Sequence, residues 1–222
     1  MLFQIVSKMK IGVICEGHTD RAVISKILKG LKGIDSSQIV PLRPDYSRDE
    51  TDLAVNPVDS FCSWTNVREE CLNREKISRF LSNEDQGIII IQVDSAESHE
   101  FGVTKPEKNQ NYSSVLRQRI IEKINEWLDN EFLDETIYAV AIEETEAWIL
   151  TIYESRDSTT SADPKARLKR ILSKKGVKYT HNLEGFSDIS DKFSKRKNFA
   201  KEKYLTFNQS LADFCQEVED KL

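Results

Sequence analysis

Acidic residues follow three apolar segments of the chain, and their spacing suits the binding of a divalent cation. They are, in chain order, Glu16, Asp20, Asp94, Glu97, Glu143, Glu144 and Glu146. Mg²⁺ is coordinated by oxygen atoms, usually those of one or two carboxylates together with water and phosphate. Because crowded like charges repel one another, a bound cation is the simplest reason for a protein to assemble several carboxylates. These residues therefore predict a metal site.

Each acid also has an ordinary structural interpretation. Asp20 is as well placed to cap the following helix as to bind a metal, and Glu97 is also explained as a loop charge. Glu143 and Glu144 would point to opposite faces if they continued a strand. Asp94 follows a segment with four consecutive isoleucines. We favour a functional role for Asp94, because the end of a central strand is where ligands bind.

Other catalytic arrangements are missing from the sequence. His18, His99 and His181 lack the spacing of metal ligands and are interpreted as surface or turn residues. No Ser-His-Asp or Cys-His arrangement and no glycine-rich phosphate loop is visible. The four cysteines form no Cys-x-x-Cys pair. They predict reduced thiols in a cytoplasmic protein, as opposed to disulfides or zinc ligands.

Alternating strands and helices must position the acids. Apolar, β-branched segments predict strands at 9–16, 38–42, 87–93 and 136–142. The spacing of apolar residues and the residues that favour helix starts predict six helices. The first runs from Thr19 or Asp20 to Gly33, and the others are expected at 65–82, 115–132, 147–153, 164 to about 174, and 207–221. Such alternation is typical of an α/β protein with a mostly parallel sheet covered on both faces. Ligands bind at the carboxyl ends of such strands, so we expect the carboxylates to converge in one crevice.

The composition indicates one folded domain with a small appended piece. The 222 residues are 39% hydrophobic and 31% charged, which excludes a disordered chain, a collagen-like repeat and a disulfide scaffold. No apolar stretch approaches the roughly 20 residues that span a bilayer, and residues 1–10 are too short and too charged for a signal peptide. We expect no membrane partner. We expect a core at 1–155 with a polar insertion at about 43–64, and a basic helical extension at 156–222 packed on the core.

Basic residues are concentrated near the C-terminus. The formal net charge is −5, yet residues 164–203 contain 13 Lys and Arg against four Asp and Glu. An acidic body with a basic segment suits a metal-using enzyme with an anionic substrate. We predict nucleic-acid contacts for Lys165, Lys169, Arg170, Lys174, Lys175, Lys195 and Arg196. The alternatives are a solvated face and a docking surface for an acidic partner protein.

Three motifs resemble those of Toprim domains, the catalytic fold of type IA and type II topoisomerases, primases and OLD-family nucleases. Residues 13–20 (VICEGHTD) resemble the first motif, in its OLD-type version. Residues 88–94 resemble the strand that leads into the second motif, Asp-x-Asp, where this chain has alanine at position 96. Residues 140–148 (VAIEETEAW) resemble a signature of small stand-alone Toprim-like proteins, which are associated with phage defence and partnered with ABC-type ATPases. The helix start at 163–165 (DPK) also fits that group.

The resemblance implies a Toprim-like, Rossmann-like α/β fold and metal-dependent hydrolysis of phosphodiesters. It implies catalytic roles for Glu16 and Asp94, with Glu16 as a metal ligand or general base. It implies a shell for Mg²⁺ or Mn²⁺ that is made from Glu16, Asp20, Asp94, Glu97, Glu144 and Glu146. Two ions that stabilise the attacking and leaving oxygens are the chemistry expected of the OLD-like branch. The expected partners are nucleic acid and an ABC-type ATPase, and a homodimer is also considered.

Two other functions compete with the nuclease. The first is a catalytically silent Toprim-like module that binds nucleic acid or an ATPase partner, for which Ala96 is the main support. The second is a receiver-type domain with Asp94 as phosphoacceptor. A receiver normally has paired acids directly after its first strand, whereas Glu16 and Asp20 are one helical turn apart. The receiver interpretation therefore ranks last.

Overall fold

A sheet of four parallel strands is the centre of the fold in this computed structural model, which describes residues 9–44, 63–199 and 203–222. The spatial order is β2-β1-β3-β4, and every pairing is parallel. The strands are β1 (Ile11–Ile14), β2 (Ile39–Arg43), β3 (Ile88–Asp94) and β4 (Thr136–Ala141). The predicted α/β fold with a parallel sheet is confirmed.

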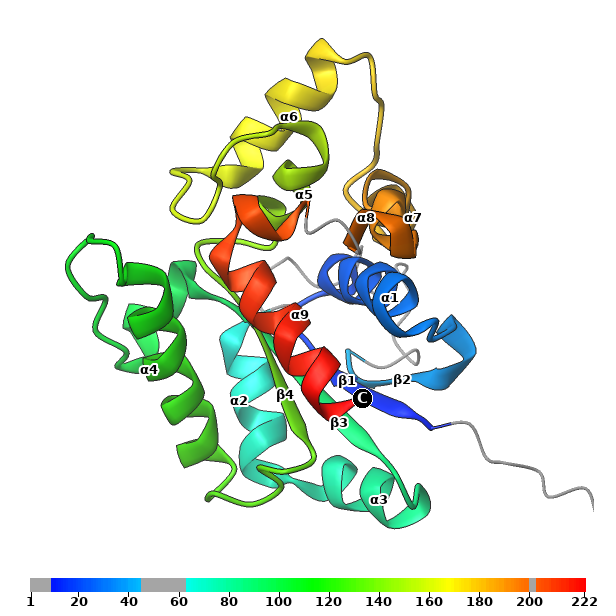
Figure 1. Ribbon diagram of the computed structural model, residues 1–222. Coiled ribbons are helices and arrows are strands. Elements are labelled where there is room, and N and C mark those ends of the chain that lie inside the picture. The colour runs from blue at the N-terminus through cyan, green and yellow to red at the C-terminus, as the bar shows by residue number, and fades with distance from the viewer. Residues whose placement is uncertain (1–8, 45–62, 200–202) are drawn as a thin grey trace, which may run out of the picture.

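Helices cover both faces of the sheet (Figure 1). The longer helices are α1 (His18–Lys32), α2 (Trp64–Asn73), α3 (Glu75–Asn83), α4 (Tyr112–Trp127), α5 (Glu146–Tyr153), α6 (Pro164–Lys174), α7 (Leu183–Ile189) and α9 (Gln209–Lys221). Shorter helical segments are η1 (Ser36–Gln38), η3 (Ser95–Phe101), η4 (Asp191–Ser194), α8 (Arg196–Phe199) and η5 (Leu205–Phe207).

Alternate residues of the strands face two separate hydrophobic clusters, as the period of a strand requires. Ile90 and Ala139 point to the cluster that contains α1, α5, α6, α7 and α9. Ile91 and Val140 point to the other cluster, which contains α2, α3 and α4. Because both faces are buried, the strands are nearly continuous apolar runs.

The C-terminal helices share the cluster of α1. Helix α7 and η4 pack on α1, while α9 lies along β4. At Gly30 of α1 a methyl group would lie 1.9 Å from the carbonyl oxygen of Phe193, so only glycine permits this close approach. The predicted extension at 156–222 therefore lies against the predicted core. Most of the predicted polar insertion at about 43–64 lies outside the described residues.

Side chains from α4 and α9 close the outer edge of β4. Glu217 Oε1 accepts a hydrogen bond from the Tyr138 backbone N–H (3.3 Å), and Arg117 Nη2 donates to the Tyr138 carbonyl (3.1 Å). Lys221 Nζ donates to the carbonyl oxygen of Thr136 (2.6 Å). Edge-strand groups that would otherwise be free to pair with another chain are thereby satisfied.

Some predicted elements differ from the structure. The helix predicted at 65–82 is divided at Arg74, which has a left-handed φ of 59° and lies between α2 and α3. The Arg74 guanidinium donates to the Leu128 carbonyl (3.3 Å) and lies 3.4 Å from the Asp129 carboxylate, so tertiary contacts hold the break. Sequence spacing does not predict η3, α7 or α8. The start of α6 is confirmed, because Asp163 accepts a hydrogen bond from the Ala166 N–H (3.0 Å).

Candidate functional site

Glu16 and Asp94 lie side by side, because β1 and β3 are neighbours that end at the same edge of the sheet. Glu16 Oε1 accepts a hydrogen bond from the Asp94 backbone N–H (2.5 Å). The Asp94 carbonyl accepts another from Nε1 of the buried Trp64, at 2.7 Å. The backbone of Asp94 is thus held on two sides, which gives its side chain a defined position.

Gln92, a fully buried amide, joins three of the segments that meet at this edge. Its Oε1 accepts from the Glu16 backbone N–H (3.1 Å), and its Nε2 donates to Asp94 Oδ1 (2.9 Å) and to Thr145 Oγ1 (3.2 Å). Thr145 in turn donates to Asp94 Oδ1 from its N–H (3.1 Å) and its hydroxyl (2.8 Å). Sequence reasoning missed Gln92 and Thr145. The available signal was the one polar side chain within the apolar segment IIIIQV.

Asp20 and Glu146 extend the group of acids from two helices. Asp20 lies in the first turn of α1 and is 9% exposed, and Glu146 is the first residue of α5 and is 6% exposed. Burial raises the pKa of Asp20 to about 6, even though hydrogen bonds from Thr145 and from backbone N–H groups oppose the increase. Burial, together with repulsion from Asp20 and Glu144, raises the pKa of Glu146 to about 7.

The four carboxylates of Glu16, Asp20, Asp94 and Glu146 act on one another, and we name them the acidic cluster. Burial, followed by repulsion from Asp20, raises the pKa of Glu16 well above its usual value. Burial, followed by repulsion from Asp20, Glu16 and Glu146, does the same for Asp94. Without a cation, the cluster therefore retains protons that isolated carboxylates would lose.

The remaining predicted acids lie around the cluster. Glu97 is exposed on η3 and adds repulsion on Glu16. Glu144 Oε2 accepts a hydrogen bond from the Lys165 backbone N–H (3.2 Å). Strand β4 ends at Ala141, and Glu143 has a left-handed φ of 65°. The strand alternation expected for Glu143 and Glu144 is therefore wrong.

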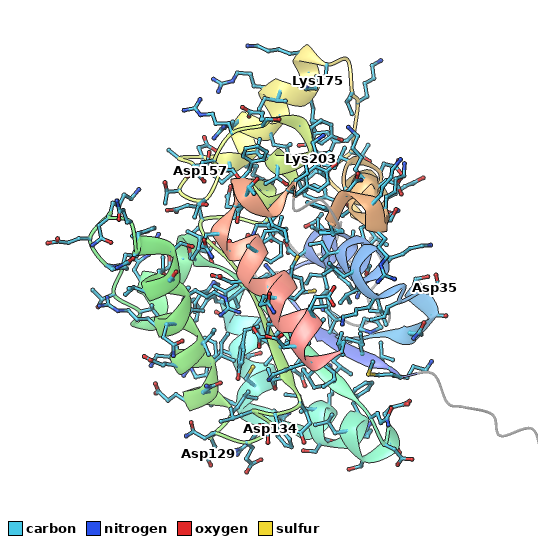
Figure 2. The ribbon with its side chains drawn as sticks, viewed as in Figure 1. Asp35, Asp129, Asp134, Asp157, Lys175 and Lys203 are labelled. Atoms are coloured by element: carbon cyan, nitrogen blue, oxygen red, sulfur yellow. The ribbon has the colours of Figure 1, made fainter. Side chains whose placement is uncertain are left out.

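Lys165 brings the basic helix α6 to the acidic cluster. Its charge lowers the pKa of both Asp20 and Glu146, against the larger effect of burial. The exposed cations Lys169, Arg170, Lys174 and Lys175 follow along α6, and no ion pair among the described residues includes them. Lys175 lies at the far end of the helix (Figure 2).

The other predicted basic contacts lie on α8 and the residue before it. Lys195 Nζ lies 3.8 Å from Asp191 Oδ2. Arg196 lines a cavity whose other walls are α1, η5 and α9. Helix α8 packs against α1, whereas α6 packs against α5. The predicted nucleic-acid contacts are therefore divided between two parts of the fold.

The acidic cluster has the donor chemistry of a Mg²⁺ site but no formed coordination group. Within the described ranges, no set of three or more His, Cys, Asp and Glu side chains is arranged to hold a metal ion. At Asp94, Oδ1 already accepts three hydrogen bonds from Gln92 and Thr145. Asp94 Oδ2 and Glu16 Oε2 have no hydrogen-bond partner among the described residues. These oxygen atoms fit a hard cation.

Three of the four cysteines, Cys15, Cys71 and Cys215, are free and buried. Cys62 lies outside the described residues. No helix in the described part of the chain is both long and apolar enough to cross a membrane. Comparisons with known proteins give no significant match, whether to protein-family models, to curated protein sequences or to solved structures.

Proposed function

We propose that this protein hydrolyses phosphodiester bonds of nucleic acid with the help of Mg²⁺ or Mn²⁺ bound at the acidic cluster. One observation carries the proposal. Four carboxylates whose pKa values are raised, first of all by burial, meet at the carboxyl edge of a parallel sheet, and a helix with exposed cations begins beside them. An acidic site repels a polyanion unless a cation neutralises the carboxylates, and the cations of α6 offset the remaining repulsion.

In this proposal Glu16 and Asp94 hold the cation, and Asp20 and Glu146 complete its surroundings. When bound, the ion supplies electrostatic stabilisation of the attacking and leaving oxygens. Gln92 and Thr145 orient Asp94 through the hydrogen bonds described above. Lys165 is close enough to act on the cluster and is placed to contact a phosphate oxygen of the substrate. The exposed cations further along α6 hold the phosphate backbone.

Neutral replacements at the sheet edge test the chemistry. Glu16→Gln and Asp94→Asn keep the shape of the side chains and remove the charge that holds the cation. We expect both variants to lose Mg²⁺- or Mn²⁺-dependent cleavage of plasmid, single-stranded DNA and RNA, and to lose Mn²⁺ binding measured by calorimetry. Glu122→Gln, an exposed change on α4, serves as the matched control and should behave as the unaltered protein. Circular dichroism should show that all variants are folded.

A catalytically silent module is the second candidate, and two observations favour it. The position of the second aspartate in the Toprim motif is occupied by Ala96, whose N–H donates to the Glu143 carbonyl (3.0 Å). The described residues also lack a formed metal group. Unaltered protein that binds nucleic acid but cleaves nothing in Mg²⁺ or Mn²⁺, alone or with a co-purifying ATPase, would replace the nuclease proposal with this one.

Charge reversal tests the role of α6 in binding. Replacement of Lys169, Arg170 and Lys174 by glutamate is expected to weaken nucleic-acid binding and to flatten its salt dependence. Each lost phosphate contact reduces the slope of log K against log salt by about 0.9 on duplex DNA. Reversal of Lys10, Lys29 and Lys32 is the matched control, because these residues lie at the opposite edge of the sheet. Equal slopes for the two triple variants would show that α6 does not contact the substrate.

A further inference from the structure

The loop after α6 holds two aromatic rings against a third. The Tyr179 ring lies 5.8 Å from the Phe186 ring at an interplanar angle of 71°, and the His181 ring lies 5.1 Å from it at 78°. Phe186 on α7 is buried, whereas Tyr179 is half-buried and His181 is exposed. The two outer rings, which we name the aromatic pair, are thus supported by a core side chain while part of each remains accessible.

The aromatic pair lies beside the acidic cluster. The charge of Lys165 acts on Tyr179 and His181 as well as on Asp20 and Glu146. The charge of Glu146 also acts on Tyr179. One lysine is therefore near both the rings and the carboxylates. This is the arrangement in which a phosphate held by the lysine would place its neighbouring base near the rings.

Two polar features of the pair bear on a ligand. The Tyr179 hydroxyl has no hydrogen-bond partner among the described residues, as is also true of Tyr204, whereas the tyrosines at 112, 138 and 153 each donate a hydrogen bond from the hydroxyl. Burial and the charge of Lys165 lower the pKa of His181, which favours the neutral imidazole. A neutral ring offers a flat face without the charge of an imidazolium.

We infer that the aromatic pair stacks on unpaired bases, so that the proposed nuclease site takes single-stranded nucleic acid. Proteins that bind single strands combine a positively charged path for the backbone with aromatic rings on which bases stack. Helix α6 supplies the path and the aromatic pair supplies the rings. A duplex keeps its base faces stacked inside and cannot use such rings. The inference rests on the proposed function for the cleavage step but not for the binding step.

Binding without cleavage tests the inference. Glu16→Gln protein is mixed, in EDTA, with fluorescein-labelled oligo(dT), oligo(U) and a duplex of equal length, and anisotropy is followed. In this background, Tyr179→Ala is expected to weaken single-strand binding about tenfold, since stacking on one ring commonly gives an effect of this order. Duplex binding should change less than about twofold. The DNA and RNA arms show which single strand is preferred.

Conservative variants separate stacking from support of the loop. Tyr179→Phe and His181→Phe keep a ring and should bind single strands as the Glu16→Gln background does, whereas Tyr179→Leu keeps apolar volume without a ring and should not. Leu183→Ala removes another exposed apolar side chain from α7 and serves as the matched control. The fluorescence of a 2-aminopurine in the oligonucleotide should be quenched on binding, and the quenching should be lost in Tyr179→Leu.

The outcomes distinguish this inference from the proposed function. Unchanged binding in Tyr179→Leu, or equal weakening on single strands and duplex, would overturn the aromatic role. Cleavage of single strands at full rate by Tyr179→Leu would overturn it while leaving the nuclease intact. Ring-dependent binding of single strands by unaltered protein that cleaves nothing would support the aromatic role and refute the nuclease.

Discussion

Replacing Asp20 by asparagine is expected to stabilise the protein at about pH 8 in metal-free buffer. The Asp20 side chain is 9% exposed, and its pKa is raised to about 6, first of all by burial. The folded protein therefore binds this proton more tightly than the unfolded chain does. The stabilisation that the proton provides is complete below the ordinary pKa of 3.8 and is lost as the pH rises through about 6. Asparagine stays neutral throughout.

The magnitude follows from the two pKa values. A difference from 3.8 to about 6 corresponds to about 3 kcal/mol at pH 8, at 1.36 kcal/mol for each pKa unit. For a chain of 222 residues this is an increase of about 6–12 °C in Tm. Loss of the repulsion that Asp20 exerts on Glu16, Asp94 and Glu146 acts in the same direction. Near pH 4 the advantage should fall below about 1 kcal/mol, because Asp20 is then protonated in the folded state.

Urea unfolding followed by circular dichroism, with EDTA, at about pH 4, 6 and 8 measures the effect. Asp188→Asn, the same change at an exposed position on α7, is the control for the loss of one negative charge. Added Mg²⁺ should stabilise the unaltered protein by about 2.7 kcal/mol at a concentration 100 times Kd. The difference in stability between Asp20→Asn and the unaltered protein should therefore become smaller. The account of the acidic cluster would be refuted if Asp20→Asn were less stable than the unaltered protein at pH 8. It would also be refuted if the substitution changed the free energy of unfolding equally at pH 4 and pH 8.

Three further substitutions test how the site and the fold are held. Gln92→Leu removes the buried amide that connects the ends of β1 and β3 with the residue before α5. Urea unfolding should show that the free energy of unfolding falls by about 2–3 kcal/mol, and Mn²⁺ binding should weaken. An unchanged free energy of unfolding would contradict the bridging role. Glu217→Ala removes the ion-pair partner of Arg117 at the edge of β4 and should lower the free energy of unfolding by about 3 kcal/mol. The control is Glu219→Ala, which removes an exposed carboxylate and should lower it by less than about 1 kcal/mol in the same assay. Gly30→Ala places a methyl group 1.9 Å from the Phe193 carbonyl oxygen and should lower Tm by several degrees. An unchanged Tm would mean that α1 and η4 can move apart with no loss of stability.

The α/β class and several of its elements could be predicted from the sequence, because the signals involved are local. Runs of β-branched residues between amphipathic segments predicted the parallel sheet, which the structure confirms. Proline after Asp163 predicted the start of α6. The rule that acids at strand ends share one edge predicted that Glu16 and Asp94 lie together, and they do. Whether they bind a metal stays a prediction.

Tertiary contacts between distant residues decided what the sequence did not. Gln92 meets Glu16, which is 76 residues away, and Thr145, which is 53 residues away. No spacing rule relates such positions, so an isolated glutamine in an apolar strand carries no indication of its partners.

The same physical reason applies to the breaks in regular structure and to the aromatic pair. Arg74 interrupts a helical pattern because Leu128 and Asp129 hold its side chain. Tyr179 and His181 form an accessible pair only because Phe186, on the next helix, supports both rings. Periodicity reports which face of an element is buried. Only the folded chain determines which residues of other elements meet that face.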